Sequence, residues 1–286
     1  MKQVLDPRLN AYRIDLADEK LRNQVASENY TSSRPAHVIS HFADILKEPD
    51  HDSGLQTQIL SGHDLEVFEN RNGWSWIQRQ VDGYVGYVAS DQLTDGTFPA
   101  THMILNPRTF LYPEPDLKSP RCGYLSMGSR VWVTGSTETR GTRYAELKNG
   151  SYVVEKHLIA IGEWRDDPVA VAETLLHAPY LWGGDSGFGI DCSGLVFLSN
   201  MLCGIKVLRD SDMQALTIGV ELETDYKSLR RGDLVFWKGH VGMMADHEFL
   251  LHANGNTMNV AIERLDEAIE RIGYLYGQPT AVRRPQ

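Results

Sequence analysis

The alternation of hydrophobic and polar positions predicts short β-strands over residues 57–93. Asn72-Gly73 and Asp82-Gly83 interrupt the alternation at places typical of hairpin turns. The apolar runs between these turns cover residues 59–60, 65–68, 74–77 and 84–88. The segment therefore predicts a small, strongly bent β-barrel.

A second run of the same kind covers residues 103–162, with strands expected at 103–105, 109–112, 130–134, 144–147 and 152–154. The phrase GSRVWVTGSTETRGTRYAELKNGSYVVEKHL is similar to GHDLEVFENRNGWSWIQRQVDGYVGYVASDQL in length, turn placement and ending. This repeat predicts two similar units in tandem. Both resemble bacterial SH3-like domains.

Helical spacing marks two other parts of the chain. Before the first barrel, the predicted amphipathic stretch has apolar residues at Val38, Ile39, Phe42, Ile45 and Leu46. After Gly162, Asp167-Pro168 suits a helix start, and the apolar spacing from Val169 ends at Ala178-Pro179. The remainder of the chain reads as mixed α and β.

Composition narrows the class of protein. The length of 286 residues suits two or three domains, and 42% hydrophobic with 23% charged residues is ordinary for a folded protein. A net charge of -10 disfavours nucleic-acid and anionic-lipid partners, which need clustered cations. No apolar stretch approaches the ~18 residues of a membrane span, and the beginning of the chain lacks the apolar region of an export signal. No obligate protein partner is implied.

The three cysteines, Cys122, Cys192 and Cys203, are sparse and lack CxxC spacing, so free thiols in a reducing compartment are expected. Together with the missing export signal, this predicts a cytoplasmic protein. Four glycines lead into Cys192, and the apolar run that follows predicts a helix from Cys192 to Gly204. A helix N-terminus should lower the pKa of the Cys192 thiol and supply N–H groups for an oxyanion. Cys122 and Cys203 are expected to have no catalytic role.

A base for this thiol is available further along the chain. The segment RRGDLVFWKGHVGMMAD predicts a strand at 234–237, a turn, and His240 at the start of a second strand. FLLHANG places His252 at the end of a third strand. A tight turn near Asp246 would bring His240 and His252 side by side, so that His252 orients the base. A zinc site is disfavoured because no compact ligand spacing such as HExxH occurs.

The strings IDCSGLV, GDLVFWKGHVGMM and LLHANG, in this order, resemble the NlpC-type cell-wall peptidases of the papain-like superfamily. The resemblance covers about residues 167–284. It implies an α+β fold: a papain-like catalytic domain, with its cysteine helix packed on an antiparallel sheet, preceded by two SH3-like barrels. The expected division is a lead-in at 1–50 packed on the first barrel, barrels at 51–98 and 99–163, and the peptidase at 164–286.

The resemblance also implies a role for each site residue. Cys192 would be the nucleophile, His240 the general base and His252 the polar residue that orients it, while Tyr180 would assist the oxyanion site. The residues implied in substrate binding are Trp182, Asp191, Ser193, Asp210, Ser211, and, from the first barrel, Tyr84 and Asp64. Relatives usually carry an acidic residue after the glycine at Gly62, where this chain has His63 and then Asp64. Whether Asp64 or His63 takes that role stays open.

The activity implied by the resemblance is hydrolysis of the γ-D-glutamyl to diamino-acid bond in short peptidoglycan peptides with a free N-terminal L-Ala. The diamino acid would be diaminopimelate or Lys, the product L-Ala-γ-D-Glu, and no cofactor or metal is required. Two alternatives stay open. One is an acyltransferase or amidase that acts on another small amide, and the other is a catalytically silent protein that binds cell-wall peptides.

Overall fold

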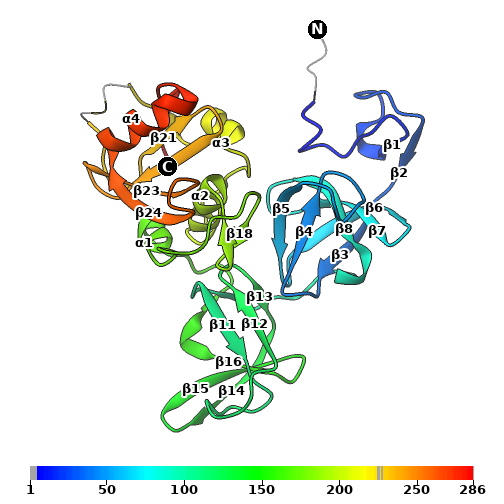
Figure 1. The fold of residues 1–286 in the computed structure, drawn as a ribbon. Helices are drawn as coiled ribbons and strands as arrows, with labels where there is room; N and C mark the ends of the chain where they lie inside the picture. The colour runs from blue at the N-terminus through cyan, green and yellow to red at the C-terminus, as the bar shows by residue number, and fades with distance from the viewer. Residues whose placement is uncertain (1–4, 224–225, 227, 286) are drawn as a thin grey trace. The chain divides into compact units, whose positions relative to one another are not determined.

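The computed structural model describes residues 5–223, 226 and 228–285. The first four residues of the predicted lead-in and the final residue of the predicted peptidase domain lie outside this description. The chain divides into two compact units, drawn in Figure 1. One unit comprises Met1–Ile104 with Thr109–Ile161, and the other comprises Leu105–Arg108 with Gly162–Gln286.

The first barrel of unit 1 is a seven-stranded antiparallel sheet in the order β5-β4-β8-β7-β6-β3-β9. A short 3-10 turn, η2 (Ser90–Gln92), precedes its last strand. At the tip of one hairpin, Asn72 and Gly73 both have positive φ, at 53° and 83°, which is the backbone that such a tight turn requires. The strands are β3 (Arg34–Val38), β4 (Phe42–Leu46), β5 (Leu55–Leu60), β6 (Asp64–Arg71), β7 (Trp74–Arg79), β8 (Val85–Ala89) and β9 (Leu93–Asp95).

The predicted amphipathic helix over residues 38–46 is wrong, because this segment forms the end of β3 and all of β4. Burial here mostly follows a period of two: Val38 is buried while Ile39 is exposed, and Asp44 is exposed between the buried Ala43 and Ile45. Short apolar runs fit both periods, and pairing with neighbouring strands decides between them. The sheet thus begins before the predicted domain start at residue 51, and the four predicted domain ranges stay predictions.

The segment before the barrel contains β1 (Leu16–Asp18), η1 (Glu19–Leu21) and β2 (Asn29–Thr31), with β1 and β2 paired in parallel. It packs on the barrel through Ala11, which joins a small apolar cluster with Phe68 and Trp76. The Arg13 guanidinium lies 4.3 Å from the ring centre of Trp76 and pairs with Glu69 at 2.8 Å. Apolar and charged contacts together therefore fasten this segment to the barrel.

The second barrel of unit 1 is built from three small sheets, in the orders β13-β10-β17, β11-β12 and β14-β15-β16. Its core is the buried apolar cluster of Ile104, Leu111, Leu125, Val131, Ala145, Leu147 and Val153. Its elements are β10 (His102–Ile104), β11 (Arg108–Leu111), β12 (Gly123–Ser126), β13 (Arg130–Val131), β14 (Val133–Thr139), β15 (Thr142–Leu147), β16 (Tyr152–Val154), η3 (Glu155–His157) and β17 (Leu158–Ala160).

Unit 2 contains a six-stranded antiparallel sheet in the order β20-β25-β21-β22-β23-β24, with helices packed on it. This arrangement confirms the predicted α+β fold. Its elements are α1 (Pro168–Glu173), β18 (Asp185–Ser186), β19 (Gly189–Ile190), α2 (Cys192–Met201), α3 (Ser211–Thr217), β20 (Val220–Glu221), β21 (Leu234–Trp237), β22 (His240–Met244), β23 (Phe249–Asn254), β24 (Asn259–Arg264), α4 (Leu265–Tyr276) and β25 (Ala281–Arg284).

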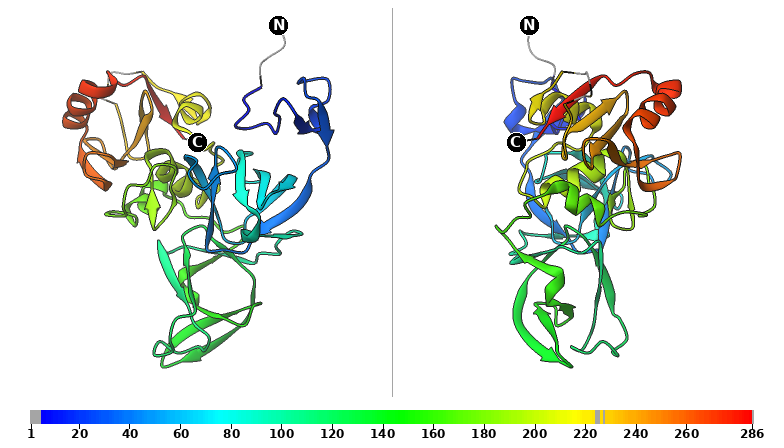
Figure 2. Two further views of the ribbon diagram at one scale, coloured as in Figure 1. Left: turned by 45° about the vertical axis from the view of Figure 1, so that its right-hand side comes forward. Right: turned by 90° about the vertical axis from the view of Figure 1, so that its left-hand side faces the viewer.

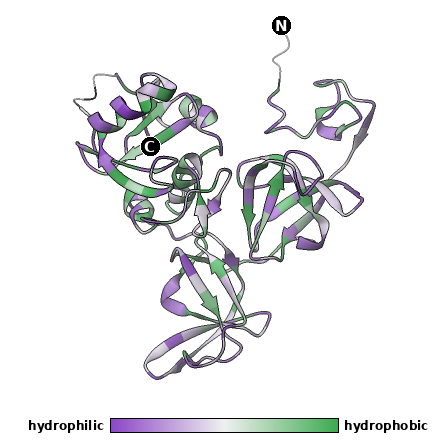
Figure 3. Cartoon of the chain, in the orientation of Figure 1, coloured by the Kyte–Doolittle hydropathy of each residue, from purple (hydrophilic) through white to green (hydrophobic). Residues whose placement is uncertain are grey.

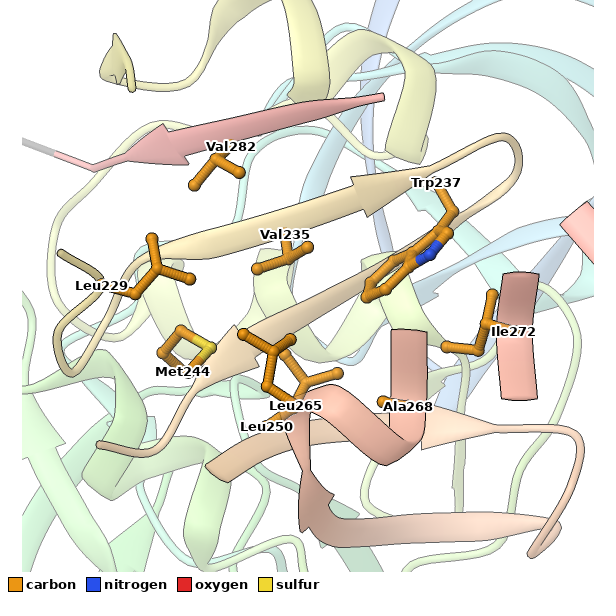
Figure 4. Packing of buried hydrophobic residues seen from close by; sticks show 9 residues of the cluster. All are labelled: Leu229, Val235, Trp237, Met244, Leu250, Leu265, Ala268, Ile272 and Val282. Atoms are coloured by element: carbon orange, nitrogen blue, oxygen red, sulfur yellow. The ribbon is translucent and has the colours of Figure 1, made fainter. Parts of the chain in front are cut away.

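Two helices cover opposite faces of this sheet, as Figure 2 shows for α2 and α4. The apolar positions of the strands and helices explain why they pack together. In Figure 3 the strands and α2 are largely apolar, whereas α4 carries both apolar and polar positions. Figure 4 shows the cluster under α4. It comprises Leu229, Val235, Trp237, Met244, Leu250, Leu265, Ala268, Ile272 and Val282. Burying each large side chain of such a cluster contributes about 1.5–3 kcal/mol, so the strands are held firmly in register.

Within the described residues, no helix has the length and apolar character that crossing a membrane requires.

Candidate active site

Cys192 is the first residue of α2, the position that the glycine-rich approach predicts. Asp191 caps the helix, since its Oδ1 atom accepts a hydrogen bond from the Gly194 backbone N–H at 2.7 Å. A side chain at position 194 is excluded, because its Cβ would lie 2.4 Å from the carbonyl oxygen of Gly184. The DCSG sequence thus lets the first turn of α2 approach the preceding loop closely.

The electrostatics of Cys192 differ from the prediction. Burial, followed by the charge of Asp191, raises the pKa of its thiol to about 12. Backbone hydrogen bonds from Val241 and Ser193 act in the opposite direction but are outweighed. The prediction of a lowered thiol pKa was wrong. The sequence indicates the helix N-terminus, but it does not reveal that the Cys192 side chain is only 6% exposed. The resting thiol is therefore neutral.

His240 and His252 lie side by side on neighbouring strands, as predicted. Antiparallel pairing of Met243 with Leu251 sets the register of β22 and β23. His240 Nε2 is 2.8 Å from His252 Nδ1. The hairpin that joins the strands is closed by Asp246, whose Oδ1 accepts a hydrogen bond from the Phe249 N–H at 2.8 Å.

His240 is neutral in this arrangement. Burial lowers its pKa to about 3, and the neighbouring His252 and Arg271 act in the same direction. A neutral imidazole can accept a proton, which is what a general base requires. Since the backbone of Val241, the next residue, hydrogen-bonds the Cys192 sulfur, the first residues of β22 adjoin the thiol. A neutral thiol and a neutral imidazole thus belong to one site.

Two residues that sequence reasoning missed extend this group. Glu263 Oε1, on β24, lies 2.7 Å from His252 Nε2. The contact is close but not aligned as a regular hydrogen bond. Arg271 of α4 pairs with the same carboxylate oxygen. One signal could have placed Glu263 on the same face of the sheet as His252. It is the alternation of side chains along β24, taken together with the pairing of β24 with β23.

Tyr180 and Trp182 lie on the loop before the cysteine helix. Tyr180 forms an isolated parallel bridge with Ile190, two residues before Cys192. Burial raises the pKa of its hydroxyl, and the negative charge of Asp191 adds to this effect, so the hydroxyl stays protonated. Trp182 is 68% exposed. Its indole is thus available to a ligand.

A buried ion network, also missed from the sequence, surrounds the residue before the nucleophile. The fully buried Arg209 places Nη2 at 2.9 Å from Asp191 Oδ2 and Nε at 3.6 Å from Asp185 Oδ2. Its Nη1 donates to Ser193 Oγ at 2.8 Å. Asp191 Oδ2 also accepts from the Gly183 N–H at 2.8 Å. The polar atoms of Asp191 and Ser193, two of the predicted substrate-binding residues, therefore already have partners within the protein.

Asp210 and Ser211 lie at the start of α3. Asp210 occupies the N-cap position without a capping hydrogen bond from its side chain, and Ser211 is the first helical residue. Both are partly exposed. The carboxylate of Asp210 adds to the negative charge around Arg209. The structure thus places these two side chains at the edge of the network that contains Asp191.

The two predicted residues of the first barrel have partners within unit 1. Tyr84 is 2% exposed, with the Arg79 guanidinium 5.7 Å from its ring centre. Asp64 Oδ1 accepts from the Phe98 N–H at 2.8 Å, and its Oδ2 is 3.8 Å from Arg130. His63, the other residue at this position, is buried with Nε2 2.9 Å from the Gly128 carbonyl oxygen. Their roles in substrate binding stay predictions.

All three cysteines are free thiols, as expected. In the described part of the chain, no group of three or more His, Cys, Asp or Glu side chains is arranged to hold a metal ion.

Two family descriptions match the chain. Residues 45–93 match the bacterial dipeptidyl-peptidase Sh3 domain, and residues 177–274 match the NlpC/P60 family. The second range contains the cysteine helix, both histidines and Glu263. The first range begins within β4, which agrees with the early start of the barrel in the structure.

Individual relatives span most of the chain. Dipeptidyl-peptidase 6 of Lysinibacillus sphaericus is 29% identical over 252 residues, covering 81% of this chain and 92% of the relative. Gamma-D-glutamyl-L-lysine dipeptidyl-peptidase of Bacillus cereus is 26% identical over 238 residues, covering 76% and 70%. The crystal structure of an NlpC/P60 family protein from Bacillus cereus has the same fold, with a TM-score of 0.74 at 22% identity, covering 88% of this chain and 99% of that chain. The chain therefore carries a bacterial SH3 domain and a cysteine peptidase domain of the NlpC/P60 type.

Proposed function

We propose that this peptidase acts on peptides derived from peptidoglycan and hydrolyses the bond between γ-D-glutamate and a diamino acid. The substrate would be a short peptide with a free N-terminal L-Ala, and the released product would be L-Ala-γ-D-Glu. The names of two relatives support this bond, since both are gamma-D-glutamyl-L-lysine dipeptidyl-peptidases, from Bacillus cereus and Bacillus subtilis. The diamino acid would be Lys or diaminopimelate.

The observation that carries the proposal is the contact between His240 Nε2 and His252 Nδ1 next to the capped helix of Cys192. A thiol nucleophile needs a base, and the base needs a group that holds its orientation. The three side chains come from α2, β22 and β23, and rigid elements hold each of them. This arrangement favours thiol-mediated acyl chemistry over passive binding of a peptide.

The neutral resting state sets the order of events. Because both Cys192 and His240 start uncharged, the proton moves from sulfur to imidazole as sulfur attacks the carbonyl carbon. The carbonyl oxygen becomes an oxyanion, which the Cys192 backbone N–H and the Tyr180 hydroxyl would stabilise. The imidazolium then protonates the leaving amine of the diamino acid, the C–N bond breaks, and a thioester remains. Water, deprotonated by His240, hydrolyses the thioester and restores the thiol.

Recognition of a free ammonium requires carboxylates and hydroxyls. Asp191 and Ser193, which flank the nucleophile, and Asp210 and Ser211, at the start of α3, supply both kinds of group. The exposed indole of Trp182 offers a wall for the peptide. The proximity of Arg209 moderates the negative charge of Asp191. Asp210 also lies near Arg209, and we propose that the carboxylates of Asp191 and Asp210 together attract the ammonium.

Tyr84 and Asp64 of the first barrel remain proposed contributors to this recognition. Only the resemblance supports their role, because in unit 1 Tyr84 is buried and Asp64 already accepts a hydrogen bond from the Phe98 N–H. We also propose a cytoplasmic location. The free thiols of Cys122, which is exposed, and of Cys203 support it, since such thiols persist in a reducing compartment.

The experiment that tests the proposed function compares L-Ala-γ-D-Glu-L-Lys, the diaminopimelate analogue, and N-acetylated versions of both. Initial rates and product masses are measured with the purified protein. We expect L-Ala-γ-D-Glu from the free peptides, and a rate at least about 100-fold lower for the acetylated ones, because removing a buried charge partner costs about 3 kcal/mol or more. Equal rates for free and acetylated peptides would contradict recognition of the ammonium. Cleavage at another bond would contradict the proposed specificity.

A further inference from the structure

We propose that Glu263, held in place by Arg271, is a positioning residue that selects the tautomer of His252 and, through it, the tautomer of the base His240. This inference deepens the proposed function and rests on it, because it assigns Cys192 and His240 their roles in the same reaction. It concerns the side of His252 that faces away from the base.

Strand pairing brings the three side chains to one face of the sheet. His252 pairs with Ala261, and Glu263 follows two residues later on the same strand, so Glu263 and His252 point to the same face. Diagonal neighbours of this kind are within reach of a long side chain. Glu263 Oε1 lies 2.7 Å from His252 Nε2. A different register of β24 would separate them.

The contacts indicate where the protons of a neutral His252 and a neutral His240 lie. A carboxylate accepts but does not donate, so His252 carries its proton on Nε2, next to Glu263. In a neutral imidazole the other nitrogen is then an acceptor. His252 Nδ1 therefore accepts from His240, and the proton of His240 lies on Nε2. The Nδ1 atom of His240 is left with a free lone pair, which makes it the atom that receives the thiol proton.

Arg271 keeps the carboxylate in its ionised form. Burial alone would raise the pKa of Glu263, but the hydrogen-bonding contributions of His252 and Arg271 outweigh it, and the pKa of Glu263 is lowered. Arg271 projects from α4, whose inner face packs on the same side of the sheet. The groups that act on the pKa of Glu263 are His252 of β23 and Arg271 of α4, and Glu263 in turn acts on the pKa of His240 of β22.

The opposite charges of Glu263 and Arg271 act oppositely on the base. The carboxylate raises the pKa of His240, whereas the guanidinium lowers it. An ion pair with a merely structural role would, when broken from either side, lower stability without this difference in sign. Opposite shifts would therefore show that both charges act on the base as well as on stability, while the tautomers themselves report the positioning role.

The first test reads the protons directly. Two-dimensional NMR of protein labelled with ¹⁵N in the histidine rings distinguishes protonated from bare ring nitrogens, and His240→Gln and His252→Gln variants assign the signals. In the wild type we expect both His252 and His240 to be protonated on Nε2. In Glu263→Leu we expect a mixture of tautomers for His252. The opposite tautomer in the wild type, or an unchanged His252 in Glu263→Leu, would overturn the proposal.

The second test uses the pH dependence of kcat/KM on L-Ala-γ-D-Glu-L-Lys. The limb of the pH profile that reports His240 should move to lower pH in Glu263→Gln and to higher pH in Arg271→Met, each by about 0.5–1 unit. We also expect kcat to fall about 10-fold or more in Glu263→Gln at nearly constant KM, as a wrong tautomer impairs the base. Glu248→Gln, which breaks the nearby ion pair with Arg264, should move neither limb. Shifts of the same sign in both variants, or no shift, would contradict the proposal.

The two tests distinguish a failure of the positioning role from a failure of the proposed function. The NMR experiment needs no substrate, so it judges the role of Glu263 even if the peptide is not cleaved. If the wild type does not cleave any γ-D-glutamyl peptide, the proposed function fails while the tautomer assignment can still hold. If cleavage occurs but the tautomers do not depend on Glu263, the positioning role alone fails.

Discussion

His240 Nε2 lies 2.8 Å from His252 Nδ1, and this contact joins two strands whose hairpin turn is only a few residues long. The contact predicts a difference between two substitutions at position 252. Asn can place its side-chain oxygen where Nδ1 accepts the hydrogen bond, whereas Leu cannot accept one. We expect His252→Asn to keep kcat within about 10-fold of the wild type and His252→Leu to lose about 100-fold or more. Steady-state kinetics with matched melting curves measure this difference, and equal losses in both variants would contradict it.

A second prediction concerns the ionisation of the nucleophile. Because burial raises the pKa of the Cys192 thiol to about 12, the resting enzyme holds little thiolate at neutral pH. Alkylation of Cys192 by iodoacetamide should therefore keep rising with pH through 9, since the thiolate is the reactive form. Mass spectrometry of the Cys192 peptide separates this reaction from that of the exposed Cys122. A rate that is already constant between pH 6 and 8 would instead indicate a preformed thiolate and imidazolium pair.

A third prediction concerns the stability of unit 2. Arg209 is fully buried between Asp185 and Asp191, so Arg209→Met leaves two buried carboxylates without their cation. The expected loss in free energy of unfolding is about 3–5 kcal/mol. Arg231→Met is the matched control, because Arg231 pairs with Glu173 at the surface and its loss should cost no more than about 1 kcal/mol. Urea unfolding followed by circular dichroism compares the two. Similar losses of unfolding free energy in both variants would show that the buried ion network stabilises the protein no more than the surface ion pair does.

A fourth prediction concerns the acid stability of unit 1. Burial, and secondarily the charge of Arg130, lowers the pKa of His63 to about 3. A histidine whose pKa is lowered by folding stabilises the protein above its unfolded pKa of about 6.5, and this contribution is lost as the pH falls toward the folded value. His63→Gln keeps a donor for the Gly128 carbonyl oxygen but does not titrate. The variant should therefore lose less stability than the wild type between pH 6.5 and about 3. Parallel pH dependences of the melting temperatures would contradict this.

Parts of the site that follow from local sequence could be predicted. The glycine-rich approach, the capping Asp191 and the apolar run after Cys192 together specify a helix start, and the structure has one there. The short segment between His240 and His252 left little choice but an antiparallel hairpin. In both cases neighbouring residues carry the signal, so no knowledge of distant contacts was needed.

Parts that depend on distant contacts could not be predicted. Residues 38–46 have apolar spacing compatible with a helix, and only pairing with other strands makes them β3 and β4. Glu263 and Arg209 resemble ordinary charged residues in the sequence, because their importance comes from partners on other elements. The direction of the Cys192 pKa depends on burial, which the fold determines and the local sequence does not reveal.

The most direct test of the account is the cleavage of L-Ala-γ-D-Glu-L-Lys by the wild type, Cys192→Ala and His240→Gln, with the products identified by mass spectrometry. Melting curves of the three proteins ensure that each is folded. We expect release of L-Ala-γ-D-Glu by the wild type, no detectable release by Cys192→Ala, and a rate lowered by about 100-fold or more in His240→Gln. Release of the same product by Cys192→Ala at the wild-type rate would contradict the assignment of the nucleophile, and with it the mechanism.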